Sequence, residues 1–220
     1  MLRRSQRRRM IRKLVSDRDI DGLLAWSDQD PDTAQRVIAL VFERDDELRW
    51  HAIDALGQLA AHLAKRDGLE RVRGLIRRLL WLMNDESGGI VWHGPEAIAE
   101  ILANVPELVG EYGRIVASFI DEDPFGPGVH WAVARLASTA PEELAWIKDR
   151  LRLSSEHPEE RAYGLVALAA FDRASAVEAA RERFDDHEPL VSYDPATGTL
   201  TSTTVGVIAR KVALLASDAA

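Results

Sequence analysis

Tryptophan and histidine stand side by side at three places in the chain, and these pairs contain residue types suited to ligand or proton chemistry. The pairs are Trp50 with His51, Trp92 with His93, and Trp131 with His130. An imidazole can ligate a metal ion or exchange a proton near neutral pH, and a neighbouring carboxylate would complete either arrangement. Tryptophan is also enriched among the residues that dominate binding energy at interfaces. The pairs therefore indicate a binding surface, a metal site or acid–base chemistry.

The metal and acid–base interpretations both require separate segments to converge. A metal site would take its imidazoles from His51, His93 and His130 and a carboxylate from Asp54, Glu86 or Glu96. No His-x-x-x-His sequence is present that would place two imidazoles on one helix face. Glu86 and Glu96 could form an acid–base pair, but chance pairs are common in a chain with 36 acidic residues. A binding surface is therefore the favoured interpretation.

The chain lacks the sequence patterns of common catalytic and nucleotide-binding sites. Neither Gly-x-Ser-x-Gly nor His-Glu-x-x-His occurs, and the absence of cysteine excludes a thiol nucleophile, thiolate metal sites and disulfides. The glycine-containing stretches 88–89 and 126–128 precede no Lys-Ser or Lys-Thr and follow no expected strand, so neither is a P-loop. The helix starts beside them could still bind an anion with help from Arg49 or Arg135. We expect a non-catalytic protein that holds no cofactor.

Proline, acidic residues and apolar periodicity place these side chains near helix starts. The dipeptide Pro-Glu occurs at positions 95, 106, 141 and 158, where proline loses no hydrogen bond and glutamate meets the positive end of the helix dipole. Apolar stripes predict helices over residues 47–65, 69–83, 95–104 and 174–184, two short helices within 11–26, and a helix that begins at Pro31 with Asp30 as N-cap. Residues 190–193 and 199–202 predict a β-hairpin, with Thr203 or Thr204 as the N-cap of the last helix.

The second helix of each predicted pair carries a small residue at an equivalent position, which would let neighbouring helices approach closely. These residues are Ala52, Gly94, Ala132, Gly164 and Gly206, and their spacings average near the roughly 40 residues of a two-helix repeat. The pattern predicts an all-α fold, a right-handed α-α superhelix with a small β-hairpin before the last helix. We expect one domain over residues 1–220, with a basic arm and cap helices in 1–29, four helical hairpins in 30–171 and an atypical repeat in 172–220.

Residues 48–57, with the sequence LRWHAIDALG, resemble the second helix of a HEAT repeat. The likeness to the HEAT-repeat superfamily, including the HEAT-like repeats of phycobilisome lyases, covers about residues 31–220 and is looser near Gly94, Ala132 and Gly164. The loops 84–95 and 123–129 are also similar to those of an uncharacterised group of small bacterial HEAT-like proteins. This resemblance implies that the chain binds other macromolecules along a concave face. One alternative is a lyase- or chaperone-like protein that binds a cofactor or metal there, and a third possibility is self-association through the repeat ends.

In a HEAT-like stack the second helices line the concave surface, so their starts would form one strip. The predicted strip contains Arg49, Trp50, His51, Glu86, Trp92, His93, Glu96, His130, Trp131 and Arg135. Tryptophan and arginine are enriched at binding hot spots, which favours a protein or peptide partner. The competing interpretation is that the tryptophans pack between repeats and the histidines lie on a solvated edge.

Charge is divided unevenly between the N-terminal arm and the rest of the chain. The first 13 residues carry seven basic side chains and no acidic one, and subtracting these seven charges from the total of −8 leaves −15 on the rest. An acidic body repels phosphate backbones, so nucleic acid is not an expected partner, and DNA-repair enzymes built from HEAT-like repeats are a poor match. No apolar run approaches the roughly 18 residues of a membrane span, and no apolar region follows the basic arm, so we expect a cytoplasmic protein.

Overall fold

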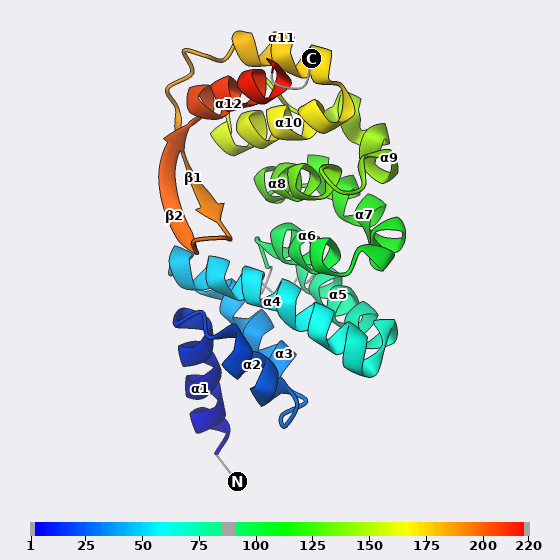
Figure 1. Cartoon of the computed structure of the whole chain (residues 1–220), viewed down its shortest axis with the longest axis vertical. Helices are drawn as coiled ribbons and strands as arrows, with labels where there is room; N and C mark the ends of the chain where they lie inside the picture. The colour runs from blue at the N-terminus through cyan, green and yellow to red at the C-terminus, as the bar shows by residue number, and fades with distance from the viewer. Residues whose placement is uncertain (1–2, 85–90, 218–220) are drawn as a thin grey trace. The chain divides into compact units, whose positions relative to one another are not determined.

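The computed structural model describes residues 3–84 and 91–217, which form two compact units (Figure 1). The first unit comprises the chain up to Leu108 together with the turn Pro195–Thr199, and the second comprises Val109–Asp194 and the chain from Leu200 onward. The regular structure of the described residues is helical apart from one two-stranded sheet directly before the last helix. The all-α class and the position of the β-hairpin are therefore confirmed.

The first unit is built around its longest helix, α4. Its elements are α1 (Arg4–Ser16), α2 (Ile20–Ser27), α3 (Thr33–Ile38) with a 3₁₀ turn η1 (Ala39–Phe42), α4 (Asp46–Asp67), α5 (Leu69–Met83), α6 (Gly94–Asn104) and a 3₁₀ turn η2 (Pro106–Leu108). Helices α1, α2, α3, α5 and α6 all pack against α4. Residues 50–57 of α4 are consequently buried without interruption, because neighbouring helices cover more than one of its faces.

The second unit has α10 at its centre. Its elements are α7 (Val109–Ser118), η3 (Phe119–Asp121), α8 (Gly126–Ala137), α9 (Pro141–Leu144), η4 (Ala145–Arg150), α10 (Pro158–Phe171), α11 (Arg173–Arg181), β1 (Pro189–Asp194), β2 (Thr199–Thr204) and α12 (Val205–Ser217). Helix α10 packs against α8, α11 and α12. Its buried Leu165 and Leu168 join Ala176, Ala180, Ala209 and Val212 in one apolar cluster.

Local capping explains where most of these helices begin. The side chains of Asp19, Asp45 and Asp172 accept hydrogen bonds from the first-turn N–H groups of α2, α4 and α11. Thr204 accepts one from Val207 N at 3.3 Å, which confirms the predicted cap of the last helix. Helix α5 has the predicted bounds. As predicted, the first turns of α6, α9 and α10 contain Pro95, Pro141 and Pro158, respectively. Pro106 opens a 3₁₀ turn instead.

The predicted start at Asp30 and Pro31 is wrong by two residues. Asp30 accepts a hydrogen bond from Asp32 N at 3.2 Å and its carbonyl accepts one from Thr33 N, so residues 30–32 form a turn and α3 begins at Thr33. The Asp30 carboxylate also bonds the Arg36 guanidinium at 2.8 Å. These bonds to a later backbone group and a distant side chain compete with simple N-capping.

The small residues of the predicted repeat are tightly packed. Ala52 and Ala132 are fully buried. A Cβ on Gly94 would lie 2.6 Å from Met83 Cγ, one on Gly164 would lie 2.8 Å from Leu153 Cδ2, and one on Gly206 would lie 2.5 Å from the Phe184 carbonyl oxygen, so none has room for a methyl group without a shift. Met83 belongs to α5, whereas Leu153 and Phe184 lie in segments between helices, so the closest contact of Gly164 and Gly206 is with connecting segments.

No helix of residues 3–84 or 91–217 is both long and apolar enough to cross a membrane.

Gly57 and Gly74 provide a matched test of close helix packing. A Cβ on Gly57 of α4 would lie 2.8 Å from the Glu100 carbonyl oxygen of α6, whereas nothing lies within 4 Å of a Cβ on Gly74. We expect Gly57→Ala to lower the free energy of unfolding by about 1–3 kcal/mol through overpacking. Gly74→Ala should raise it by about 0.5–1 kcal/mol, because alanine favours the helix. Urea unfolding followed by circular dichroism measures both, and equal effects would contradict close packing of α4 on α6.

Candidate functional site

The start of α6 carries three residues of the predicted strip. Trp92 is 65% exposed and precedes the helix. His93 Nδ1 donates to Glu96 Oε1 at 2.9 Å, and the Glu96 carboxylate is buried in the first turn of α6. The positive end of the helix dipole favours a carboxylate at this position. Glu96 Oε2 is itself buried and has no hydrogen-bond partner among the described residues.

Trp81 joins this corner of the first unit, although the predicted strip did not include it. Trp81 is 55% exposed at the end of α5, and the Arg78 guanidinium lies 4.5 Å from its ring centroid. Val91 N donates to the Leu82 carbonyl oxygen at 3.3 Å. Trp81 directly precedes Leu82 and Trp92 directly follows Val91, so each exposed tryptophan is next to one residue of this bonded pair. Trp81 lies off the apolar stripe of α5, which is the sequence signal that could have identified it. We call Arg78, Trp81, Trp92, His93 and Glu96 the tryptophan corner.

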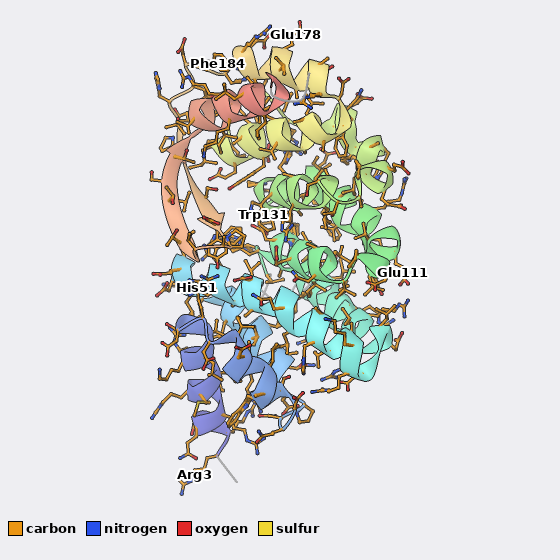
Figure 2. All side chains as sticks on the ribbon, viewed as in Figure 1. Arg3, His51, Glu111, Trp131, Glu178 and Phe184 are labelled. Carbon is orange, nitrogen blue, oxygen red and sulfur yellow. The ribbon has the colours of Figure 1, made fainter. Side chains whose placement is uncertain are left out.

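The start of α4 is packed into the first unit. Arg49 bonds the Glu43 carbonyl oxygen at 3.1 Å and Asp46 at 2.7 Å, and Trp50 is buried. His51 is also buried, and its Nε2 donates to the Gly198 carbonyl oxygen at 2.9 Å (Figure 2). His51 therefore holds the turn between β1 and β2.

Arg18 holds the same turn from another direction. Its guanidinium bonds Asp54 Oδ2 at 3.2 Å and the Pro195 carbonyl oxygen at 2.6 Å. Arg18 has a φ of 53° at the end of α1, where Asp19 N donates to the Leu14 carbonyl oxygen and Arg18 N to that of Val15. This is a Schellman motif with arginine at the position that glycine usually occupies. Nothing in the sequence pattern distinguishes Arg18 from the other arginines of the arm.

In the second unit, His130 has no exposed surface, and backbone groups occupy both of its ring nitrogens. Nδ1 donates to the Gly126 carbonyl oxygen at 2.7 Å, and Nε2 accepts from Arg152 N at 3.0 Å. These bonds specify the neutral tautomer with its proton on Nδ1. Burial lowers the pKa of His130, outweighing the bond to Gly126. The ring offers a partner no unoccupied nitrogen.

An ion-pair network with one buried carboxylate lies beside His130. Arg152 contacts Glu160 at 3.3 Å and Asp121 at 2.9 Å, and Glu160 is buried. Hydrogen bonds from Arg152 and Arg150 lower the pKa of Asp121. Because the guanidinium of Arg152 bridges the two carboxylates while its backbone N–H bonds His130, the network fixes the start of α8.

Trp131 and Arg135 are partly exposed and lie about one turn apart on α8, where Figure 2 labels Trp131. They form a second, smaller surface of the same residue types. Glu86, the remaining residue of the predicted strip, lies outside the described residues.

The His, Asp and Glu side chains of the described residues do not form a metal-binding cluster. Among residues 3–84 and 91–217, no group of three or more His, Asp or Glu side chains is placed to hold a metal ion. The convergence of His51, His93 and His130 that a metal site would require is not found, since each ring bonds the group described above.

Comparison with known proteins identifies the fold. No protein-family model matches the chain. An uncharacterised protein of Archaeoglobus fulgidus is 33% identical over 87 residues, which are 40% of this chain and 44% of that protein, so the match spans less than half of the relative's length. A crystal structure of an engineered protein matches with a TM-score of 0.56 at 17% identity, covering 96% of this chain and 89% of the other. A designed armadillo repeat protein matches with a TM-score of 0.55 at 16% identity, covering 98% and 95%.

The chain therefore has the fold of armadillo-like helical-repeat proteins, as the repeat pattern predicted. The particular resemblance to HEAT repeats of the phycobilisome-lyase type stays a prediction.

Protonation of His130 is expected to destabilise the second unit. Because the folded-state pKa is depressed, the unfolded chain binds this proton more tightly, and stability is lost as the pH falls below about 6.5 toward the folded-state value. One such group contributes a slope of at most about 1.4 kcal/mol per pH unit. We expect the urea midpoint to fall between about pH 7.5 and about pH 5.5, and His130→Gln to remove this part of the fall. An unchanged slope in the variant would assign the effect to other groups.

Proposed function

We propose that this protein is a non-catalytic scaffold that binds a protein or peptide partner, and that the tryptophan corner is its main contact in the first unit. The observation that carries the proposal is the exposure of Trp81 and Trp92 at one corner between α5 and α6. Large aromatic rings are normally covered, so two exposed ones, each next to one residue of the hydrogen-bonded pair Leu82 and Val91, favour a binding surface. The helical-repeat fold supports the same function by analogy with other repeat proteins.

The polar groups of the corner suit recognition of a polypeptide. The indole rings would supply the buried apolar area that dominates hot spots, and Arg78 would supply a cation beside one of them. The buried Glu96 carboxylate accepts a bond from His93 and would fix the imidazole, which is partly exposed to a partner. A hydrogen bond to an ionised acceptor is stronger than one between neutral groups.

The other residues of the predicted strip would either contact the partner directly or support the fold around the contact surface. Trp131 and Arg135 would form a contact surface on α8 of the second unit. Arg49, Trp50, His51 and His130 would act indirectly because they are partly or fully buried, and Arg49, His51 and His130 bond backbone carbonyl groups. A role for Glu86 and a single strip along one concave face remain proposals.

The repeat type, the cellular location and the absence of a cofactor, all inferred from the sequence, are part of the same proposal. We propose that the chain is one HEAT-like domain that acts in the cytoplasm without a cofactor. The alternative is a lyase- or chaperone-like protein that binds a cofactor or metal at the same residues. No contact in the described residues favours that alternative over polypeptide binding.

Truncation of both exposed tryptophans should abolish partner capture. We would immobilise the wild type and the Trp81→Ala, Trp92→Ala variant, identify retained proteins by mass spectrometry, and measure the affinity of each by calorimetry. Hot-spot residues contribute about 2 kcal/mol or more, so we expect a loss of roughly thirtyfold or greater. The fold should be unchanged in circular dichroism because both rings are exposed.

The matched control is Met10→Ala, Phe42→Ala, which removes two exposed apolar side chains elsewhere in the first unit. Equal losses in the two variants would contradict a specific corner. Co-purification of a small molecule or metal that depends on Trp81 and Trp92, without a protein, would favour the cofactor-binding alternative instead.

A further inference from the structure

Helix α1 carries arginines on the side that packs against the other helices of the first unit. Ile11 and Val15 are buried on this side in the C-terminal half of the helix. One to two turns earlier the same side carries Arg4, Arg7 and Arg8, since residues three and four apart share a helix face. These arginines and the α3 residues opposite them line a groove of about 720 Å³. The groove therefore continues the packing seam of α1 with guanidinium groups in place of apolar side chains.

Two of the guanidinium groups in this groove are held in place by buried carboxylate oxygens. Asp30 Oδ2 lies 2.8 Å from Arg36 Nη1 and 3.4 Å from Arg7 Nη1, and Asp30 is buried. Burial would raise the pKa of Asp30, but the Asp32 backbone N–H and the Arg36 guanidinium hold it below its usual value. Arg36 also contacts Asp32 at 3.1 Å. Arg7 and Arg36 are thus oriented before any ligand arrives.

The other two guanidinium groups of the groove are available to a ligand. Arg4 and Arg8 line it and are exposed, and their side chains make no ion pair or hydrogen bond with the described residues. The lining holds four arginines against one carboxylate, that of Asp32, and Asp30 lies behind two of them. Four neighbouring cations repel one another, and this repulsion would be relieved by a bound anion.

We propose that the groove between α1 and α3 binds a ligand with two or more linked phosphate groups. Guanidinium groups match phosphate oxygens with paired hydrogen bonds, and several converge here. The volume lies in the usual range of roughly 300–1,000 Å³ for small-molecule sites. Because these arginines line a groove between two helices, they suit a small oligophosphate better than a flat membrane surface. The site is separate from the tryptophan corner, and neither proposal depends on the other.

Tripolyphosphate binding to the full chain tests this proposal by calorimetry at about 50 mM salt, where screening is modest. We expect binding by the wild type and a loss of affinity of about tenfold or more in Arg4→Gln, Arg8→Gln, since each arginine would lose charge-assisted hydrogen bonds. Both side chains are exposed, so the variant should keep the circular dichroism spectrum and urea midpoint of the wild type.

The control variant Arg9→Gln, Arg44→Gln removes the same number of charges from exposed positions that do not line the groove. It should bind tripolyphosphate within about twofold of the wild type. Equal losses in the two variants, or no binding by the wild type, would overturn the proposal. Binding to phosphatidylserine vesicles without binding to tripolyphosphate would also overturn it, because the arginines would then contact a membrane surface.

Discussion

Close contact between neighbouring helices is the constraint on which this structure depends. Gly57 of α4 lies against the backbone of Glu100 in α6, and Gly164 of α10 packs against the ring of His130 in α8. A repeat unit cannot cover its own apolar face, so stability requires each helix to lie on the next. Where side chains are this small, little more than backbone separates the helices.

Polar residues near helix starts are consequently used to satisfy backbone groups. His130 bonds the Gly126 carbonyl oxygen and the Arg152 N–H, and His51 bonds the carbonyl oxygen of Gly198. A buried backbone group without a partner would destabilise the fold by about 1–3 kcal/mol. Two histidines whose positions indicate chemistry thus have structural roles, whereas His93 stays partly exposed at its helix start.

Three buried carboxylates, two in the first unit and one in the second, are paired with arginine. Asp30 bonds Arg36, Asp54 bonds Arg18, and Glu160 contacts Arg152. A buried charge requires such a partner because removal from water is costly. The pairing also limits the motion of the guanidinium group. In the groove beside α1, Asp30 orients Arg7 of the basic arm and Arg36 of α3 in this way.

The sequence by itself determined the helices, the β-hairpin and the small residues of the repeat. Apolar periodicity, caps and turn residues act over a few positions, so the bounds of α5 and the cap at Thr204 could be predicted. Only the tertiary structure decided which aromatic and polar side chains are exposed. Trp81 and Trp92 are exposed while Trp50 is buried, although all three lie near helix ends. Burial depends on which distant helix covers a residue, and Arg18 acts on Pro195, 177 positions away.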